Sequence, residues 1–480
     1  MRPYMRAANV TWQGIDTTDV KEMDFTPAEY KVYALRRGDI LLGEASGSPG
    51  EVGKPAIWRD DVPGACFQNT LIRVRTVIPG LVPFLHLHFV RDARNGRFAA
   101  ASRGVGIHHL GSETLSDWEV ELPPLAEQRR IVEATESYFS RLDDAVATLE
   151  RVQRNLKRYR ASVLKAAVEG RLVPTEAELA RAEGRDYEPA SVLLDRILAE
   201  RRRRWHESGA RGKYQEPAPP DTTNLPTLPE GWCWAKIDAV GDVQLGRQRA
   251  PRHHNGPYMR PYLRVANVFE DRIDTSDVME MNFSPAEYET YRLVPKDILL
   301  NEGQSPHLVG RPAMYRGEVP GACFQNTLVR FRAVPALDAD YALIVFRAQL
   351  HSQRYLRIAK ITTNIAHLGA ERFSDVEFPL PPLAEQRRIV SSVQETLSLT
   401  TATDRTLDAV MRRCARLRQA ILKWAFEGKL ADQDPDDEPA SVLVERIRME
   451  TAARAPRVPD GASRKARRRR GRVAATGDMK

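Results

Sequence analysis

Cysteine is scarce in this chain of 480 residues: there are four, and no two form a Cys-x-x-Cys pair. That spacing excludes a zinc ribbon and a disulfide framework. Apolar runs such as Tyr341 to Phe346 are too short to cross a bilayer. The opening Met-Arg-Pro-Tyr lacks the apolar core of a secretory signal. We therefore expect a reduced, cytoplasmic protein without a membrane partner.

Catalytic motifs are also missing. The chain has no Gly-x-Gly-x-x-Gly, no His-Glu-x-x-His and no Asn-Pro-Pro-aromatic tetrapeptide. Residues 47–55 (GSPGEVGKP) resemble a phosphate loop, but Pro55 replaces the Ser or Thr that would hold magnesium. His108, His109 and His367 have no acidic or cysteine companion at ligand spacing, so packing or DNA contact suits them better than a metal. We expect no catalytic residue and no metal site.

Positive charge is in excess, but it is unevenly distributed. The net charge is +8, and the pI is near 9.3. Seven of the basic residues lie in one short stretch, Arg464 to Arg472, near the C-terminus. Without this stretch the body of the chain is nearly neutral, so composition alone does not predict nucleic-acid binding. The stretch itself suits salt-sensitive phosphate attraction, with a solubilising extension as the alternative.

The strongest feature is an eleven-residue sequence, LPPLAEQRRIV, that occurs twice without change. It spans Leu122 to Val132 and again Leu380 to Val390, which are 258 positions apart. Paired prolines are excluded from a helix interior but fit its first turn. The glutamate that follows suits the positive end of a helix dipole. Each copy therefore predicts the start of a helix.

The duplication extends over most of the chain. Twenty of the thirty positions from Met1 to Tyr30 match those from Met259 to Tyr288. Val62 to Leu71 and Val319 to Leu328 are identical. Runs with β-branched residues, separated by Gly, Pro and Ser clusters, predict mixed strand and loop from Met1 to about Glu121. The chain is a tandem repeat of a globular unit followed by a long helix.

Apolar spacings of seven, three and four predict a coiled-coil seam along each long helix. The first seam is Leu142, Leu149, Val152, Leu156, Tyr159 and Val163, and the second is Leu407, Val410, Cys414, Leu417 and Ile421. Gly170 is placed to end the first helix. Cys66, Cys323 and Cys414 are expected as small buried apolar residues.

The expected fold is α+β, with two tandem globular domains alternating with two long helical segments in a pseudo-two-fold duplication. The resemblance described below implies that the globular domains are target-recognition domains and that the helical segments pack as an antiparallel coiled coil. We expect these boundaries: 1–122, first recognition domain; 123–205, first helical spacer; 206–227, linker; 228–380, second recognition domain; 381–455, second helical spacer; 456–480, basic disordered tail.

Two irregularities interrupt the repeat. Residues 228–258 precede the second copy and have no equivalent before Met1, so the chain begins about thirty residues inside its first repeat. Residues 77–106 and 335–364 differ although their flanks match. Two domains that recognise different targets would show this pattern, in which the flanking sequences are the same and the insert between them differs.

In these motifs the chain resembles the specificity (S) subunits of Type I restriction–modification systems. The resemblance rests on LPPLAEQRRIV, on Arg260 to Val268, on Gln325 to Arg332 and on Glu427 to Leu430, and it covers nearly the whole chain. It implies a DNA-recognition subunit without catalysis, which reads a bipartite site on double-stranded DNA. Helices of about 45 residues would give a spacer of about 65 Å, or two turns of DNA.

The resemblance also implies partners. Modification (M) subunits would carry S-adenosylmethionine and methylate adenine at N6, and restriction (R) subunits would use ATP and magnesium to cleave DNA. This chain itself would bind none of these cofactors. The M subunits would meet the two helix starts, at Glu127, Gln128, Arg129, Arg130, Glu385, Gln386, Arg387 and Arg388. Charge reversal at Arg387 and Arg388 is predicted to loosen M-subunit binding.

Base contacts require polar groups that reach groove edges, whereas Lys and Arg on phosphates set the register. Candidates in the first unit are Ser46, Ser48, Lys54, Gln68, Asn69, Arg91, Arg94, Arg97, Arg103 and His108. Candidates in the second are Gln304, Ser305, His307, Arg311, Gln325, Asn326, Arg354, Lys360, Thr362, Thr363 and Asn364. Substitution of Arg94 or Arg354 is predicted to weaken DNA binding.

Two other functions stay open at this point. A coiled-coil scaffold that never reads DNA would suit the duplicated helices but not the divergent inserts. A fused enzyme that methylates or cuts by itself would need a catalytic motif, which is missing from the sequence.

Overall fold

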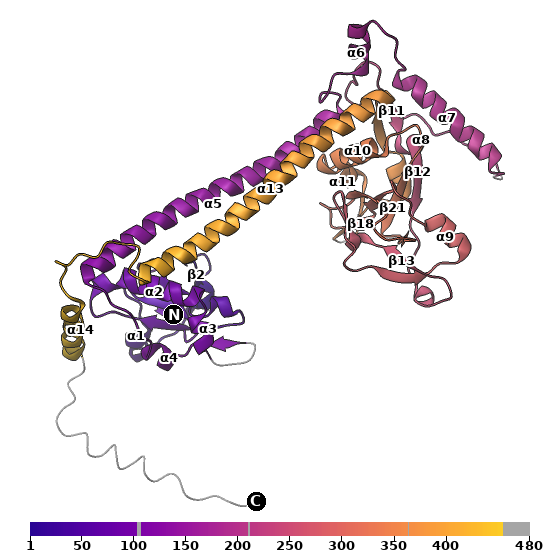
Figure 1. The fold of residues 1–480 in the computed structure, drawn as a ribbon. Helices are drawn as coiled ribbons and strands as arrows, with labels where there is room; N and C mark the ends of the chain where they lie inside the picture. Colours follow the sequence, from indigo (N-terminus) through magenta and orange to yellow (C-terminus); the bar gives the residue numbers. More distant parts are fainter. Residues whose placement is uncertain (103–106, 210–211, 363, 455–480) are drawn as a thin grey trace, which may run out of the picture. The chain divides into compact units, whose positions relative to one another are not determined.

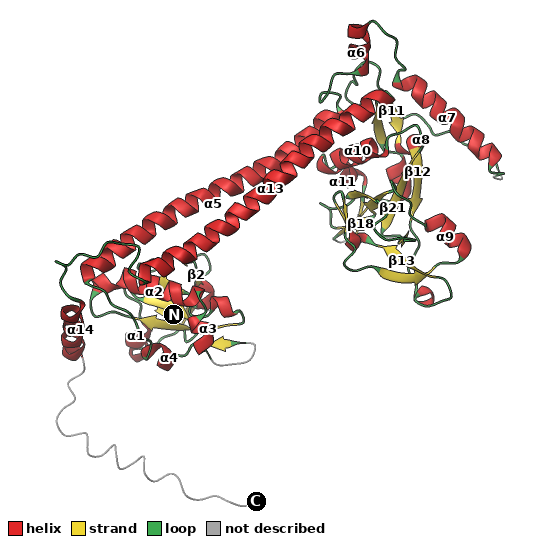
Figure 2. Cartoon of the chain, viewed as in Figure 1, coloured by secondary structure: helices red, strands yellow, loops and turns green. Residues whose placement is uncertain are grey.

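A computed structural model describes residues 1–102, 107–209, 212–362 and 364–454. The candidates Arg103 and Thr363 and the basic stretch 464–472 lie outside these residues. The chain forms two compact units, which we call unit 1 (Met1–Leu149 with Asp408–Lys480) and unit 2 (Glu150–Leu407). Helices and strands are mixed in both, as Figure 2 shows.

Unit 1 begins with the first copy of the repeat (Figure 1). Its strands are β1 (Arg2–Met5), β2 (Val10–Thr11), β3 (Gly14–Ile15), β4 (Lys21–Met23), β5 (Ile40–Gly43), β6 (Ala45–Ser46), β7 (Pro55–Ile57), β8 (Cys66–Phe67), β9 (Leu71–Val74) and β10 (His108–His109). Its helices are α1 (Pro27–Tyr33), α2 (Val82–Arg94), α3 (Arg97–Ala101), α4 (Ser112–Ser116), the first part of α5 (Leu125–Val168), the last part of α13 (Leu383–Phe426) and α14 (Ala440–Arg454).

Unit 2 holds the second copy and the remaining parts of α5 and α13. Its strands are β11 (Cys233–Lys236), β12 (Gly241–Leu245), β13 (Met259–Leu263), β14 (Val268–Phe269), β15 (Arg272–Ile273), β16 (Met279–Asn282), β17 (Ile298–Asn301), β18 (Gly303–Gln304), β19 (Pro312–Met314), β20 (Cys323–Phe324), β21 (Leu328–Ala333), β22 (Lys360–Thr362), β23 (Ile365–His367) and β24 (Glu377–Leu380). Its helices are α6 (Glu176–Glu183), α7 (Ala190–Glu207), α8 (Ile237–Val240), α9 (Pro285–Tyr291), α10 (Ala339–His351), α11 (Arg354–Ile358) and α12 (Ala370–Ser374).

The two copies of the repeat fold alike. In unit 1, β1 is antiparallel to β4 and parallel to β8, with Tyr4 opposite Cys66. In unit 2, β13 is antiparallel to β16 and parallel to β20, with Tyr262 opposite Cys323. A second sheet has the order β7-β5-β9 in unit 1 and β12-β21-β17-β19 in unit 2. The sequence duplication is thus a duplication of strand pairing and register.

The central strand of the second sheet is buried on both faces. In β5, Ile40 and Leu42 enter one apolar core and Leu41 enters another. β17 repeats this arrangement with Ile298 and Leu300 on one side and Leu299 on the other. This explains why both strands are continuous apolar runs instead of alternating patterns. Cys66, Cys323 and Cys414 are buried as predicted, and burial raises the pKa of Cys323 to about 12.

The first divergent insert lies in the segment expected to be strand and loop, and this is wrong for its larger part. Each of the two inserts begins with a helix of 13 residues, α2 in unit 1 and α10 in unit 2. Each helix is followed by a left-handed residue, Gly96 or Gln353, and by a five-residue helix, α3 or α11. The inserts therefore differ in side chains but share one backbone plan.

The predicted helix starts are confirmed. α5 and α13 begin at Leu125 and Leu383, directly after the paired prolines, and each has 44 residues. Within unit 1, Arg418 of α13 pairs with Asp143 of α5 and lies over the ring of Phe139. Within unit 2, Arg160 of α5 binds Asp404 of α13 at 2.6 Å.

The predicted seams are only half correct. Leu407, Cys414 and Ile421, seven residues apart, are buried, whereas Val410 and Leu417 between them are exposed. On α5, Val163 is buried but Val152 and Tyr159 are exposed. In unit 2, Arg160 donates to Thr400 at 2.9 Å, so polar contacts occupy part of the helix contact. The stripe between the helices is narrower than a regular two-position heptad predicts.

No helix in the described ranges combines the length and the apolar character that a membrane span requires.

Candidate nucleic-acid interface

Several candidates gather on a small two- or three-stranded sheet, which we call the arm. The unit 1 arm is β6 with β10, where Ser46 lies opposite His108. The unit 2 arm is β18-β23-β22, where Gln304 lies opposite Ala366 and Thr362 lies opposite Ile365. Lys360, Thr362 and Asn364 are exposed on this arm. Residues that lie about sixty positions apart in the sequence therefore meet in the arm.

The invariant Gln-Asn turns lie beside the root of each arm. The backbone N–H of Gln68 donates to Met5, and that of Gln325 donates to Leu263, at 2.9 and 3.0 Å. Two residues further on, the carbonyls of Thr70 and Thr327 accept from Glu44 and Glu302, the residues that precede β6 and β18. Asn69 is exposed, and Gln68, Gln325 and Asn326 are half-buried. The fixed backbone of the turn accounts for its identity in both copies.

The histidines that precede Leu-Gly have acidic partners after all. His109 lies 3.3 Å from Glu44, and His367 lies 3.2 Å from Glu302. Each carboxylate is 65 positions away from its histidine in the sequence, so ligand spacing could not reveal it. Within the described residues no three His, Cys, Asp or Glu side chains converge in a metal-binding group. These pairs connect the residue before β6 or β18 to the neighbouring strand of the arm, β10 or β23.

A second group of unit 1 candidates surrounds Trp12. Lys54 binds Glu51 at 2.5 Å, and the indole N–H of Trp12 donates to the same carboxylate at 2.8 Å. Burial on its own raises the pKa of Glu51, but the hydrogen bonds from Lys54 and Trp12 outweigh it and lower the pKa. The guanidinium of Arg94 lies over the Trp12 ring at 3.6 Å. Ser48 and Arg94 are exposed here, whereas the charge of Lys54 is already paired.

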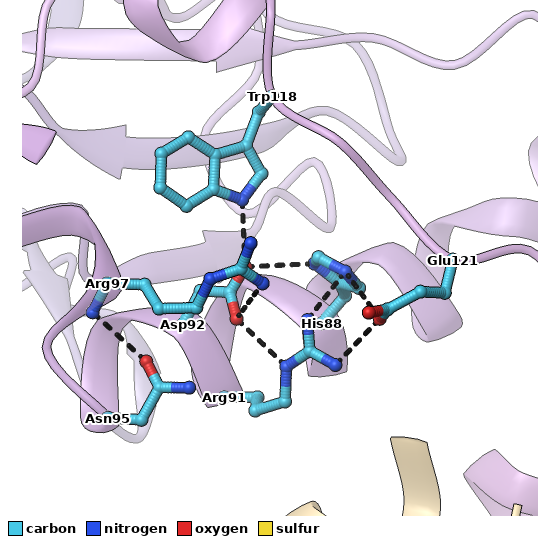
Figure 3. A network of polar contacts seen from close by, with 7 residues as sticks. All are labelled: His88, Arg91, Asp92, Asn95, Arg97, Trp118 and Glu121. Carbon is cyan, nitrogen blue, oxygen red and sulfur yellow. Dashed lines mark hydrogen bonds and ion pairs between the residues drawn. The ribbon is translucent and has the colours of Figure 1, made fainter. Parts of the chain in front are cut away.

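Arg91 and Arg97 belong to an ionic network around the buried Asp92 (Figure 3). Arg91 donates to Asp92 and Glu121, both at 2.8 Å, and Arg97 lies 3.2 Å from Asp92. The indole N–H of Trp118 donates to the same carboxylate at 2.8 Å. Burial raises the pKa of Asp92, but the bonds from Arg91 and Trp118 outweigh it and lower the pKa. Both arginines therefore hold the insert together.

His88 completes this network. Arg91 lies 2.9 Å from its Nε2, and a guanidinium only donates, so Nε2 accepts and the proton resides on Nδ1. Nδ1 is 3.4 Å from Asp92. Burial, together with the charge of Arg91, lowers the pKa of His88 to about 4. The imidazole is neutral at physiological pH.

Unit 2 candidates divide in the same way. Arg354 binds Glu377 through two hydrogen bonds of 2.6 and 2.7 Å. Arg311 lies over the ring of Phe269 at 4.8 Å, and burial lowers its pKa. Ser305 donates its backbone N–H to Gln304, and His307 is exposed. Among the unit 2 candidates, the exposed ones are thus Lys360, Thr362 and Asn364 of the arm, and His307.

The sequence analysis missed a basic loop between β12 and β13. It contains Arg249, Arg252 and His254, which are exposed. The loop is anchored by Arg247, which donates to Glu287 at 2.8 Å and to the carbonyl of Asn282 at 2.7 Å. The N–H of Asn326 donates to the carbonyl of Arg247 at 3.0 Å, which places the loop beside the Gln-Asn turn. The basic run from Arg247 to His254 was the available signal.

The second helix start is held within the chain. Glu385 is fully buried and accepts from the backbone of Glu176 at 2.8 Å and from Trp232 at 2.9 Å. Burial raises the pKa of Glu385. Gln386 accepts from the backbone of Asp338 at 2.9 Å. Arg388 binds Glu176 at 2.6 Å, whereas Arg387 is exposed.

The first helix start is held in the same way within unit 1. Glu127 and Gln128 are buried, and Gln128 donates to the carbonyl of Pro123 at 2.8 Å. Arg130 binds Asp437 at 2.7 Å, whereas Arg129 is exposed. Each LAEQRR motif therefore joins the start of one long helix to the segment that follows the other. Arg129 and Arg387 are the charged members of the motif that stay exposed.

An apolar groove also lies between the helices of unit 1. It has a volume of about 450 Å³ and is lined by Tyr138, Arg141, Leu142, Leu417, Ile421, Trp424, Lys429 and Leu430. Tyr138 and Trp424 are 45% and 46% exposed. In unit 2, Tyr159 and Leu399 are exposed on the corresponding helix pair.

Comparisons with known proteins agree with the repeat and the helix motifs. Residues 229–410 match the family model described as the Type I restriction modification DNA specificity domain. The chain is 24% identical to the EcoKI specificity subunit of Escherichia coli strain K12, over 94% of this chain and 89% of that protein. It is 25% identical to the StySPI specificity subunit of Salmonella potsdam, over the same shares of the two chains.

A solved chain supports the fold. It comes from a study of complex assembly and conformational transition of the type I R-M system, and it covers 89% of this chain and 92% of its own length. The TM-score is 0.57 at 20% identity, which is evidence for the fold. Residues 229–410 thus match the DNA specificity domain of Type I restriction–modification systems, and the chain is similar over nearly its whole length to the specificity subunits of these systems.

Proposed function

We propose that this chain is the DNA-recognition subunit of a Type I restriction–modification complex and reads a bipartite site on double-stranded DNA. One observation carries the proposal: two copies of one backbone frame present arms with different side chains. Unit 1 offers Ser46 and His108 where unit 2 offers Gln304, Lys360 and Thr362. Two domains that share one backbone arrangement but carry different side chains on their arms are suited to bind two half-sites of different sequence.

The candidate DNA contacts take two roles in this proposal. The exposed and half-buried groups outside the ion pairs read bases or bind phosphates: Ser46, Ser48, Gln68, Asn69, Arg94 and His108 in unit 1, and Gln304, Ser305, His307, Gln325, Asn326, Lys360, Thr362 and Asn364 in unit 2. The ion-paired groups Lys54, Arg91, Arg97 and Arg354, and Arg311 over the ring of Phe269, position the elements that carry them. Arg249 and Arg252 add phosphate contacts beside the unit 2 turn.

The two recognition domains would alternate with long helices that form an antiparallel coiled coil and set the half-site spacing. M subunits bring S-adenosylmethionine, and R subunits bring ATP and magnesium, while this chain remains non-catalytic in the cytoplasm. We place M-subunit docking at Arg129, Arg387 and the exposed apolar residues of the helix pairs. The buried residues of the LAEQRR motifs, Glu127, Gln128, Glu385 and Gln386, hold in place the helix starts that carry Arg129 and Arg387.

Genome-wide mapping of N6-methyladenine tests this proposal, in cells that carry the chain with its M subunit. A split motif, methylated on both strands and missing when the chain is omitted, is the expected result. A stable complex with the M subunit but without any methylated motif would instead favour the scaffold function. Methylation by the purified chain alone would contradict its non-catalytic role.

A further inference from the structure

One short run of residues is shared by the two copies at the end of the divergent inserts. It reads Ile-x-His-Leu-Gly and spans residues 107–111 in unit 1 and 365–369 in unit 2. The leucine of each run is fully buried, and the glycine has a positive φ of 62° or 70°. The histidine of each run pairs with the glutamate that precedes β6 or β18. Three of the shared residues thus have a structural reason to be the same.

The isoleucine that opens the run has no such reason. Ile107 is 55% exposed and Ile365 is 49% exposed. High strand propensity accounts for an isoleucine in a hairpin, but Ile107 lies in a bend directly before β10. Single exposed apolar residues are common on protein surfaces. The same exposed isoleucine in two arms whose neighbouring side chains differ instead indicates a contact that both arms make.

The fold presents Ile365 on one face of the unit 2 arm. It pairs with Thr362 across the β22–β23 hairpin, and two positions further along Lys360 pairs with His367. Side chains that face each other, or that lie two positions apart on one strand, share a face of the sheet. A Cβ atom on Gly303 would lie 3.3 Å from the ring of His367 and 3.9 Å from Cγ2 of Ile365. The imidazole and the isoleucine therefore lie on the same face, over Gly303.

Polar and basic groups flank the isoleucine on this face. Thr362 and Lys360 are exposed. β18 pairs with Ala366 and His367, whereas Ile365 pairs with Thr362 at the two-stranded tip of the arm. A two-stranded β-ribbon fits into the major groove of B-DNA, where the C5-methyl group of thymine is the apolar group that the base edges display. An aliphatic side chain beside a hydroxyl and an ammonium group matches such an edge and the phosphates next to it.

We propose that Ile365, and Ile107 at the same position of unit 1, contact the C5-methyl group of a thymine in the half-site that each unit reads. This inference rests on the proposed function, which requires a methylated adenine on each strand and therefore a thymine opposite each adenine. A contact with thymine suits both units although their other arm side chains differ. Those divergent side chains then distinguish the remaining base pairs of the two half-sites.

Deoxyuridine provides a direct test, since it lacks only the methyl group of thymidine. Each thymine in a duplex with the motif found by methylome mapping is replaced in turn, and binding of the complex with the M subunit is titrated. We expect one replacement in the half-site read by unit 2 to weaken binding about fourfold, which corresponds to one buried methyl group. Ile365→Ala should bind the thymine and uracil duplexes equally at that position. Ile107→Ala should have the same effect in the other half-site.

Ile361→Ala is the matched control. Ile361 is 54% exposed, but it pairs with the buried Ala366 and lies next to Thr362 along β22, so its side chain is on the opposite face of the hairpin. This variant should keep the response to uracil, and Ile365→Val, which retains most of the apolar side chain, should keep part of it. Thermal unfolding and co-purification with the M subunit should be unchanged in all variants, because the substituted side chains are exposed.

The outcomes that would overturn the inference are distinct. A uracil response that Ile365→Ala leaves unchanged would place the methyl contact elsewhere. Binding of the motif without a uracil response in either half-site would reject the contact while the proposed function stands. Weaker co-purification of Ile365→Ala with the M subunit would reject it in favour of a protein interface. If the complex selects no motif at all, the proposed function fails, and this inference fails with it.

Discussion

The helices α2 and α10 occupy the same place in the two units, yet the positions that form an ionic network on α2 carry no charge on α10. Both have 13 residues, so counting from their first residues His88 corresponds to Val345 and Asp92 to Gln349. Trp118, which binds Asp92, corresponds to Val376, which is buried. In unit 2 the aromatic rings of Phe346 and Phe373 pack at 5.3 Å nearby. The same backbone arrangement is thus stabilised by ion pairs in unit 1 and by uncharged side chains in unit 2.

This difference teaches which parts of the repeat are free to change. The frame residues are kept: Arg75 binds Asp39 and Arg332 binds Asp297, all at 2.6 Å. The insert needs only to fill the space over the sheet, with apolar contacts or with a closed set of charges. A closed ionic set is sensitive to the loss of any member, because the remaining buried charge is left unpaired. The ionic core is therefore the more fragile of the two.

The largest predicted effect is the loss of the central carboxylate. Asp92→Asn should lower the free energy of unfolding of unit 1 by about 3–5 kcal/mol, since Arg91 and Arg97 lose their shared counter-charge. Chemical denaturation, with hydrogen exchange in α2 as the local readout, measures this. Gln349→Leu at the corresponding position of unit 2 is the control, at about 1–2 kcal/mol. Equal losses would contradict the comparison.

Acidification should destabilise unit 1 selectively. The pKa of His88 is about 4 in the folded chain against 6.5 in an unfolded one. The unfolded state therefore binds more protons between these values, and stability falls as pH drops from about 6.5 to 4, by about 3 kcal/mol for this group. His88→Val, which copies Val345, should flatten the dependence of α2 exchange on pH. A profile unchanged by that variant would contradict the assignment.

Substitutions of the two arginines of the LAEQRR motif should affect different properties, one the stability of the fold and the other the binding of the M subunit. Arg388→Glu should cost unit 2 about 1–2 kcal/mol of unfolding free energy, since it places a charge against Glu176. Arg387→Glu should leave stability within about 0.5 kcal/mol and weaken M-subunit binding. Thermal unfolding and co-purification distinguish them. Arg130→Glu and Arg129→Glu are the matched variants in unit 1. If Arg387→Glu or Arg129→Glu lowered stability while Arg388→Glu or Arg130→Glu affected only M-subunit binding, the assignment of the two roles would be wrong.

A smaller contrast concerns DNA affinity. Arg94→Ala should weaken DNA binding of the M-containing complex several-fold and reduce its salt dependence, because an exposed phosphate contact is lost. Arg354→Ala should change affinity less, since its guanidinium is held by Glu377. Titration of fluorescent DNA at two salt concentrations measures both. A larger effect at Arg354 would reverse our division of the candidates.

The sequence predicted the repeat, the family and the helix starts, because these depend on local signals such as paired prolines and identical blocks. It did not reveal what the motif residues touch. Glu385 binds Trp232 and Glu176, and Glu127 contacts Gln433, all far away in the sequence. Helix α2 was missed because residues 1–121 as a whole were expected to be mixed strand and loop. The predicted seams contained too many residues, because the spacing of apolar residues shows which positions are apolar but not which of them contact the partner helix.

The most direct test of the central claim is the methylated motif of an arm variant. Lys360→Ala with Thr362→Ala alters the unit 2 arm and leaves the unit 1 arm untouched. Methylome mapping should show that one half of the split motif relaxes while the other half and the spacing are unchanged. If both halves relax together, or if neither changes while methylation persists, the arms do not read separate half-sites and the account is wrong.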